Sequence, residues 1–364
     1  MNDLTLKKDN TNRIRTLQGA RFLFVAFIYL SHCVTPNVST PFDFGGDIGV
    51  SFFFILSGFV MSWGYGPSVS RGEFSTRSYF WHHFWRLYPL HVLLFALMLA
   101  LDSRLGHKYD LVQTLSTLFL VQSWIPSNHT LYNINAVSWF LCDTLFFYLI
   151  FKQLYAWIMS IDIRRRRYSY ALLAFVSVYL IAASLVPADM TNCTLYANPL
   201  LRTIDFAIGI MAYRLYKWGT TASCPTATPL LNLPLAVYVL VGFVFYLIYQ
   251  CLGYNGCRCA ALFWPFMPFF ILKLVSADGT NDPVARLLAC RPMLWLGGIS
   301  FELFMVHLFA MRLTQHFIPL GDNVLYDYMY FAVAFVVAVV MAWLLHIGFV
   351  KPVGNVINRL FLRS

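Results

Sequence analysis

The residues of this sequence that could do chemistry are ionisable side chains inside apolar segments. Arg21 and His32 lie in one segment, about three helical turns or roughly 16 Å apart, so they would share one face of a helix. Asp143 lies in a second segment, and Glu302 and His307 lie in a third. Because such groups are costly to bury in a bilayer, each of them is a functional candidate.

These residue types suit group transfer between the two faces of a membrane. Arg21 and Arg86, near the inner face, would bind the phosphates of an anionic cytosolic cosubstrate. His32 could act as a general base near neutral pH, with a carboxylate such as Asp143 orienting its ring. A hydroxyl on the outer side would then be the acceptor.

Other interpretations stay open at this point. The same groups would fit a proton-coupled secondary transporter of a small anion, but such folds often carry internal repeats and none is evident here. His32 could instead be a structural histidine, and Asp143 could simply pair with an arginine. Asp205 with Arg202 is interpreted as a structural pair, and Ser57-Gly58 as a close contact between helices.

Several familiar motifs are missing from the sequence. It has no phosphate-binding Gly-x-x-x-x-Gly-Lys-Ser/Thr loop, so ATP-driven transport is unsupported, and no Gly-x-Ser-x-Gly or His-Glu-x-x-His motif. Cys257 and Cys259 are too close together for a zinc ribbon, so we expect no metal. In an oxidising outer compartment, Cys193 could pair with either of them.

The composition predicts that an all-α polytopic membrane protein positions these groups. The chain has 364 residues, of which 59% are hydrophobic and 12% charged, whereas soluble domains carry about a quarter charged residues. Its apolar segments predict about ten spanning helices, each near the roughly 20 residues that a span needs. The stretch Leu111–Trp124 is too short to span, so we expect a re-entrant or interfacial helix there. The spans are expected near 17–36, 47–65, 86–101, 137–159, 170–187, 199–216, 235–251, 259–275, 293–316 and 326–348.

The distribution of positive charge predicts the orientation. Most of the 26 Lys and Arg residues would face one side, which predicts that both termini are cytoplasmic and that the protein lies in the inner (plasma) membrane. The expected divisions are a tail at 1–16, a membrane domain at 17–348 and a second tail at 349–364. The net charge of +10 thus indicates lipid headgroups and anionic cosubstrates as partners, and no nucleic acid.

Several segments, in order along the chain, resemble acyltransferase family 3, a family of integral membrane enzymes that O-acylate polysaccharides, lipopolysaccharide and some small molecules. In the first segment an Arg is followed, after ten residues, by a His; in the last, a Gly-x-Ile-Ser pattern leads to a His. The matching segments are Leu17–His32, Gly49–Phe59, Trp85–Leu90, Ser138–Tyr148 and Leu296–His307.

The resemblance implies an acyl-CoA donor from the cytoplasm, an essential catalytic role for His32, and donor binding by Arg21 and Arg86. The sequence also departs from the family pattern. His83 stands where the first of two arginines is usual, and Asp143 replaces the usual Glu. In the last segment, a Phe replaces the usual Tyr.

We therefore expect an acyl-CoA-dependent O-acyltransferase that moves an acyl group, with acetyl preferred, to a hydroxyl of a carbohydrate, a glycolipid or a glycosylated small molecule. His32 and Asp143 would be catalytic, and Arg21 and Arg86 would bind acyl-CoA as a cosubstrate, with no permanently bound cofactor. Residues expected to bind the acceptor are Ser57, Trp139, Ser300, Glu302 and His307.

Overall fold

The computed structural model describes residues 14–35, 38, 44–161, 167–221, 231–252, 258–318 and 324–361. Within these ranges the regular elements are helices and there is no strand, which confirms the all-α prediction. The α-helices are α1 (Arg15–Ser31), α2 (Phe44–Ser70), α3 (Thr76–Arg104), α4 (Leu111–Leu118), α5 (Asn128–Leu131), α6 (Trp139–Ser160), α7 (Arg167–Leu185), α8 (Pro199–Thr221), α10 (Leu235–Leu252), α11 (Met267–Ala277), α12 (Pro283–Leu288), α13 (Arg291–Gly298), α14 (Ser300–Phe317), α15 (Val324–Leu345) and α16 (Lys351–Phe361). Short 3-10 turns include η2 (Gln122–Trp124), η3 (Ala136–Ser138) and η8 (Arg258–Phe263), and η6 (Asn192–Tyr196) and η9 (His346–Val350) are π-helical.

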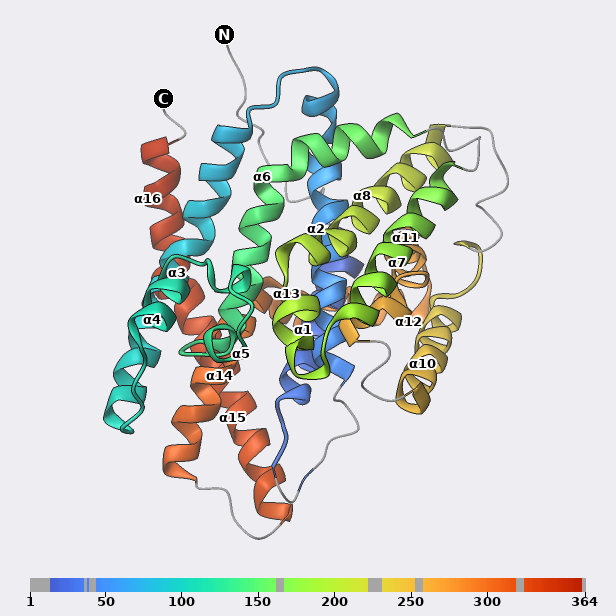
Figure 1. Ribbon diagram of the computed structural model, residues 1–364. Helices are drawn as coiled ribbons and strands as arrows, with labels where there is room; N and C mark the ends of the chain where they lie inside the picture. The colour runs from blue at the N-terminus through green and yellow to red at the C-terminus, as the bar shows by residue number, and fades with distance from the viewer. Residues whose placement is uncertain are drawn as a thin grey trace.

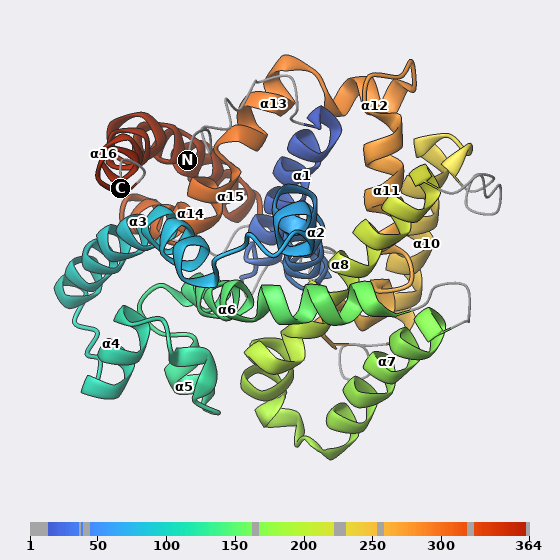
Figure 2. The ribbon, with the colours of Figure 1, turned by 90° about the horizontal axis from the view of Figure 1, so that it is seen from above.

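Helices α1 and α2 form the centre of the bundle. Seen from above, α14, α15 and α3 lie on one side of them, and α8, α11 and α10 lie on the other (Figure 2). Glycines allow a close approach where α2 meets α8: a Cβ at Gly58 would overlap the carbonyl of Phe206, and one at Gly209 would overlap the carbonyl of Ile55. Small residues at helix contacts are typical of membrane bundles.

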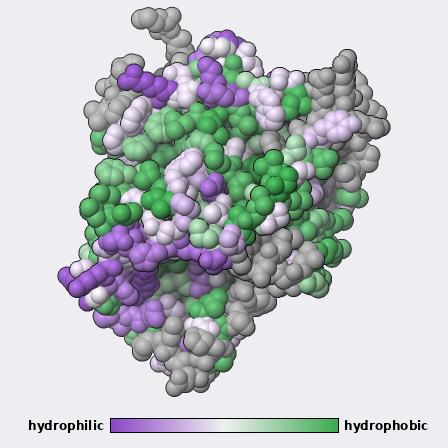
Figure 3. Space-filling model, viewed as in Figure 1, coloured by the Kyte–Doolittle hydropathy of each residue, from purple (hydrophilic) through white to green (hydrophobic). Residues whose placement is uncertain are grey.

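By length and composition, part of the bundle can cross a membrane. Among the described residues, four helical stretches qualify, and the bent pair α13 and α14 would make a fifth. Apolar residues gather across the middle of the molecular face in Figure 3, with hydrophilic residues above and below them. The protein is therefore a helical membrane protein, although the predicted count of about ten spans is not confirmed. The qualifying stretches are Gly46–Ser70, Thr76–Arg104, Ala136–Ser160 and Val324–Arg359.

Several predicted helix boundaries were wrong. The segment 293–316 is not one helix, because α13 and α14 meet at Ile299 with a bend of 69°. The segment 259–275 is divided into η8 and α11, since Pro265 between them lacks the N–H that a continuous helix needs. Helix α1 ends at Ser31, so His32 is its C-cap residue and not part of the helix interior.

The two ends of the chain and the short apolar stretch also differ in detail from expectation. Part of the predicted tail at 349–364 is helical, because α15 continues through η9 into α16, which ends at Phe361. The stretch Leu111–Trp124 begins with the short helix α4, whose N-terminus is capped by Asp110 in a capping box with Gln113. Of the tail predicted at 1–16, residues 1–13 lie outside the described part of the chain.

Candidate active site

Two histidines from different helices lie together at the C-terminal end of α1. His32, at the C-terminal end of α1, has an exposed side chain, whereas His307 in α14 is fully buried. Their ring centroids are 5.2 Å apart, and the planes are tilted by 38°. The structure therefore brings these two predicted site residues together, although they are far apart in the sequence.

The protonation of His307 is fixed by its own helix. Its Nδ1 lies 2.6 Å from the carbonyl oxygen of Phe304. Because a carbonyl can only accept a hydrogen bond, Nδ1 must carry the proton, and in a neutral ring Nε2 is then an acceptor. Nε2 is buried and has no hydrogen-bond partner among the described residues. Nε2 of His307 therefore has a lone pair that can accept a proton or a hydrogen bond.

Asp143 does not join the histidine pair. Its carboxylate is completely buried in α6, and neither oxygen has a hydrogen-bond partner in the described part of the chain. It therefore makes no hydrogen bond to His32. The hydroxyl of nearby Ser123 donates to the carbonyl of Trp139 instead (3.3 Å). The expected orientation of His32 by Asp143 is not seen in this geometry.

The charges that act on Asp143 belong to a buried ion pair on α8. Nη1 of Arg202 lies 2.9 Å from Oδ2 of Asp205, and both side chains are almost completely buried. The guanidinium also donates to Ser51 Oγ (3.0 Å), and the indole N–H of Trp264 donates to Asp205 Oδ1 (2.7 Å). The structure confirms that Arg202 and Asp205 form a pair, and the hydrogen bonds to Ser51 and from Trp264 help to stabilise its buried charges.

Aromatic rings surround the Arg202 guanidinium. Its central carbon lies 4.7 Å from the ring centroid of Tyr196, 5.7 Å from that of Phe54 and 6.0 Å from that of Trp139. Trp139, expected to bind the acceptor, is itself buried, and its ring lies 4.9 Å from that of Tyr196. These contacts are favourable cation–π distances, so Trp139 has a clear structural role around Arg202.

The N-terminal half of α3 presents a second group of polar side chains. Arg86 is exposed, and its charge acts on the phenols of Tyr65 and Tyr148. His83, one turn earlier, places Nε2 3.2 Å from the Tyr65 hydroxyl, and its ring lies 4.8 Å from that of Tyr148. The histidine that replaces an arginine of the family pattern therefore faces the same rings as Arg86.

Arg21 lies on α1, on the turn after Gln18, and is half-buried. The Gln18 amide donates to the carbonyl of Leu294 in α13 (2.9 Å), so this turn of α1 lies against α13. Ser300 bridges the bend between α13 and α14, because its hydroxyl donates to the carbonyl of Gly297 (2.9 Å). Ser57 is half-buried on α2.

Glu302 has a partner that the sequence analysis missed. Its carboxylate is buried in the first turn of α14 and lies 2.7 Å from Nδ1 of His346, the first residue of η9. His346 lies inside the predicted span 326–348, so the rule that selected Glu302, an ionisable group in an apolar segment, could have found it. π-Helical turns such as η9 are frequent at functional sites.

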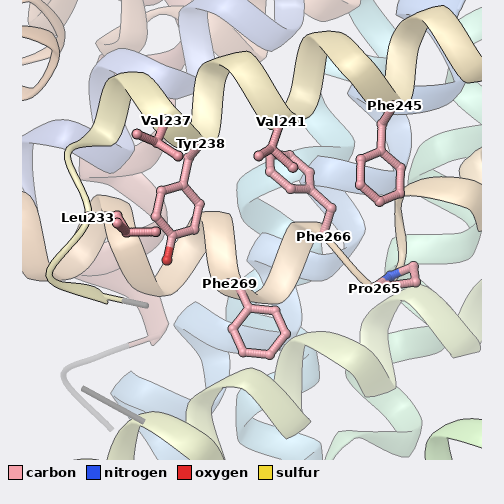
Figure 4. Close-up of a pocket in the computed structure, with 8 residues that line it drawn as sticks. All are labelled: Leu233, Val237, Tyr238, Val241, Phe245, Pro265, Phe266 and Phe269. Carbon is pink, nitrogen blue, oxygen red and sulfur yellow. The ribbon is translucent and has the colours of Figure 1, made fainter. Parts of the chain in front are cut away.

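Other features of the structure lie apart from these groups. An apolar groove of about 230 Å³ runs between α10 and α11, and its walls come from residues 233–245 and 265–269 (Figure 4). It contains none of the predicted site residues. The thiol of Cys193 is free and donates to the carbonyl of Met190, while the side chains of its proposed partners, Cys257 and Cys259, lie outside the described part.

Comparison with known proteins gives the chain a family. Residues 14–346 match the family described as an acyltransferase domain, acyltransferase 3. The Acyltransferase MdmB of Streptomyces mycarofaciens is 27% identical to the chain over 233 residues, which are 57% of this chain and 58% of that protein. The chain thus spans less than two thirds of the length of this relative. No solved structure matches it. Since the family match covers nearly the whole chain, the protein belongs to the acyltransferase 3 family of membrane acyltransferases.

Proposed function

We propose that the protein moves an acyl group, with acetyl preferred, from cytoplasmic acyl-CoA to a hydroxyl of a carbohydrate, a glycolipid or a glycosylated small molecule. The observation that carries this proposal is the pair formed by exposed His32 and buried His307, whose ring centroids are 5.2 Å apart. Membership of the acyltransferase family supports the reaction class.

His32 is the general base in this proposal. Its exposed ring can be reached by an acceptor hydroxyl. One ring nitrogen takes the hydroxyl proton while the oxygen attacks the thioester carbonyl, so that a carbon–oxygen bond forms and the carbon–sulfur bond breaks. The proton removed from the hydroxyl balances the thiolate of the departing coenzyme A. The products are the ester and free coenzyme A.

In this proposal His307, and not Asp143 as the sequence predicts, positions the His32 ring. Its Nε2 lone pair, fixed by the bond from Nδ1 to the Phe304 carbonyl, can accept the ring N–H of His32. The other nitrogen of His32 is then left unprotonated toward the acceptor, as in a catalytic triad where a buried group selects the tautomer. Asp143 remains in the proposal as a buried carboxylate that acts beside Arg202.

The inner polar groups are proposed to bind the donor. Arg86 and Arg21 would meet the phosphates of coenzyme A, with His83 adding a hydrogen-bond donor next to Arg86. Glu302 and Ser57 are kept as proposed substrate-binding residues. About ten spans with both termini in the cytoplasm, in the inner (plasma) membrane, would orient the two ends of the site in this way.

The transfer itself is tested with purified protein in liposomes that also contain a glycolipid fraction. With radiolabelled acetyl-CoA, we expect label in the lipid-glycan fraction that mild alkali releases, as an ester does. Label that appears only as free acetate, or no consumption of acetyl-CoA at all, would contradict the proposal. A boiled sample and unlabelled acetyl-CoA in excess are the controls.

A further inference from the structure

Two backbone positions between α4 and α6 are strained. Leu120, with φ of 54°, and Ile134, with φ of 40°, are the residues other than glycine that have positive φ in the described part of the chain. Ile134 is β-branched and completely buried, which makes this conformation especially unfavourable. Such strain persists only where the surroundings enforce it, and it is common at binding sites. Leu120 comes two residues before Gln122, and Ile134 comes directly before Asn135.

Asn135 has a fixed orientation with an unused acceptor. Its Nδ2 donates to the carbonyl of Met305 in α14 (3.3 Å), and its side chain is only 1% exposed. Since the Met305 carbonyl can only accept, the amide cannot turn the other way round. Its Oδ1 is buried and has no hydrogen-bond partner among the described residues.

Gln122 shows the same arrangement on η2. Its Nε2 donates to the hydroxyl of Ser138 at the start of α6 (3.0 Å), and its buried Oε1 has no donor in the described ranges. Both strained segments therefore end in an amide that turns its nitrogen into the protein and leaves its oxygen as an acceptor. Buried acceptors normally have a hydrogen-bond donor, so a bound ligand would be expected to donate to Oδ1 of Asn135 and to Oε1 of Gln122.

Asn135 and the histidine pair meet on the same turn of α14. The carbonyl that holds His307 belongs to Phe304, and the carbonyl that holds Asn135 belongs to Met305, the next residue. In the proposed mechanism Nε2 of His307 accepts the ring N–H of His32, which leaves Oδ1 of Asn135 as the acceptor beside this turn that has no partner among the described residues. A ligand that pairs with this oxygen must supply a donor, and a substrate hydroxyl does so.

We infer that Asn135 is a further specificity residue of the acceptor site, whose Oδ1 accepts a hydrogen bond from a second hydroxyl of the acyl acceptor, next to the one that His32 deprotonates. This inference rests on the proposed function and adds to it a residue that selects among acceptors. Oε1 of Gln122 is the acceptor for a further hydroxyl of the same substrate. A site that hydrogen-bonds a substrate hydroxyl rejects an analogue that lacks it.

The test compares two small probe alcohols, trans-cyclohexane-1,2-diol and cyclohexanol, which differ only in the neighbouring hydroxyl. Acetyl transfer from radiolabelled acetyl-CoA is measured with each alcohol for wild type, Asn135→Ala and Asn133→Ala in liposomes. Asn133 is the matched control, because both ends of its buried amide are bonded within the protein: Oδ1 accepts from the Thr117 hydroxyl of α4 (2.5 Å), and Nδ2 donates to the Thr130 carbonyl of α5 (2.7 Å). The readout is the ratio of kcat/KM for the two alcohols within each variant, so differences in folding or yield cancel.

We expect wild type to prefer the diol by ~10- to 100-fold in kcat/KM. In Asn135→Ala, the ratio of kcat/KM for the two alcohols should fall to the value expected from their numbers of hydroxyl groups alone. In Asn133→Ala, this ratio should stay at the wild-type value. A wild type that acylates both alcohols equally well, or a ratio that Asn135→Ala leaves unchanged, would overturn the inference alone. Failure of wild type to acylate either alcohol would contradict the proposed function as well.

Discussion

The buried ring of His307 lies beside the ring of His32, with 5.2 Å between the ring centroids. Its Nδ1 donates a hydrogen bond to the carbonyl of Phe304 (2.6 Å). This relationship gives a buried nitrogen lone pair beside an exposed imidazole. A general base needs one free nitrogen toward its substrate, and a second group that binds the other nitrogen selects that state. The pair therefore supplies, without a carboxylate, the parts that base catalysis on a hydroxyl requires.

Replacing His307 should slow acyl transfer without weakening the binding of acyl-CoA. We expect His307→Leu, which removes the acceptor nitrogen but fills most of the space, to lower kcat by ~10- to 100-fold and to leave KM for acyl-CoA unchanged. Steady-state kinetics in liposomes measure both constants.

His91→Leu is the matched control for that variant. His91 is also fully buried, its Nε2 lies 3.0 Å from the Thr117 carbonyl, and its Nδ1 has no partner among the described residues. It belongs to α3, and its ring contacts are with Tyr88 and Phe95. Equal losses of kcat in the two variants would mean that His307 acts only as a buried structural residue.

His83 is expected to tune donor affinity. Because its ring faces Tyr65 and Tyr148, the rings on which the charge of Arg86 acts, His83→Arg would place a second guanidinium beside that of Arg86. We expect KM for acyl-CoA to fall by roughly tenfold, since arginine binds phosphate through two parallel hydrogen bonds. Initial rates over a range of acyl-CoA concentrations measure this change.

His82→Arg provides the comparison, because it adds the same charge about 100° further round the helix. It should leave KM close to the wild-type value. If both variants lowered KM to the same extent, general attraction of a cationic surface for the anionic donor would explain the effect, and no specific site at His83 would be needed.

The contact between α2 and α8 should tolerate no side chain. A Cβ at Gly209 would overlap the carbonyl of Ile55, so Gly209→Ala should force the helices apart and destabilise the protein by about 1–3 kcal/mol. Gly219 lies on the same helix with nothing within 4 Å of its missing Cβ. Gly219→Ala should therefore be neutral or stabilise by up to about 1 kcal/mol. Thermal unfolding in detergent compares them, and similar midpoints for both variants would contradict the packing.

Asp282, between α11 and α12, should make the free energy of unfolding depend on pH. Burial alone would raise the pKa of its carboxyl, but backbone N–H donors from Leu235, Ala285 and Val284, with the charge of Lys273, lower this pKa below its ordinary value. A lowered pKa in the folded state means stabilisation that is present above the ordinary pKa and lost as the pH falls through the folded value.

Asp282→Ala should accordingly lower the free energy of unfolding by about 1 kcal/mol at neutral pH, the usual cost of losing an N-cap. The difference from wild type should shrink as the pH falls through about 4 and below, where the wild-type carboxyl is protonated. Unfolding midpoints between neutral and acidic pH measure it. A difference that stays constant over this range would exclude the carboxylate as the stabilising group.

The sequence alone predicted the helical segments and most of the groups in the site, because long apolar stretches and buried charges follow from the cost of polar groups in a bilayer. It could not predict the bend at Ile299, since Gly297 and Gly298 are compatible with either a continuous or a broken helix. Nor could spacing along the chain reveal that His307, and not Asp143, lies beside His32. That pairing depends on how α1 packs against α14, which is a tertiary relationship.

Acetyl transfer from radiolabelled acetyl-CoA, measured with His32→Ala at matched protein level, tests whether His32 is the catalytic base. His316→Ala is the control, because His316 is an exposed histidine in the last turn of α14. We predict that His32→Ala loses activity by ~100-fold or more, as expected for removal of a general base, while His316→Ala keeps wild-type activity. Full transfer activity in a correctly folded His32→Ala protein would contradict the account.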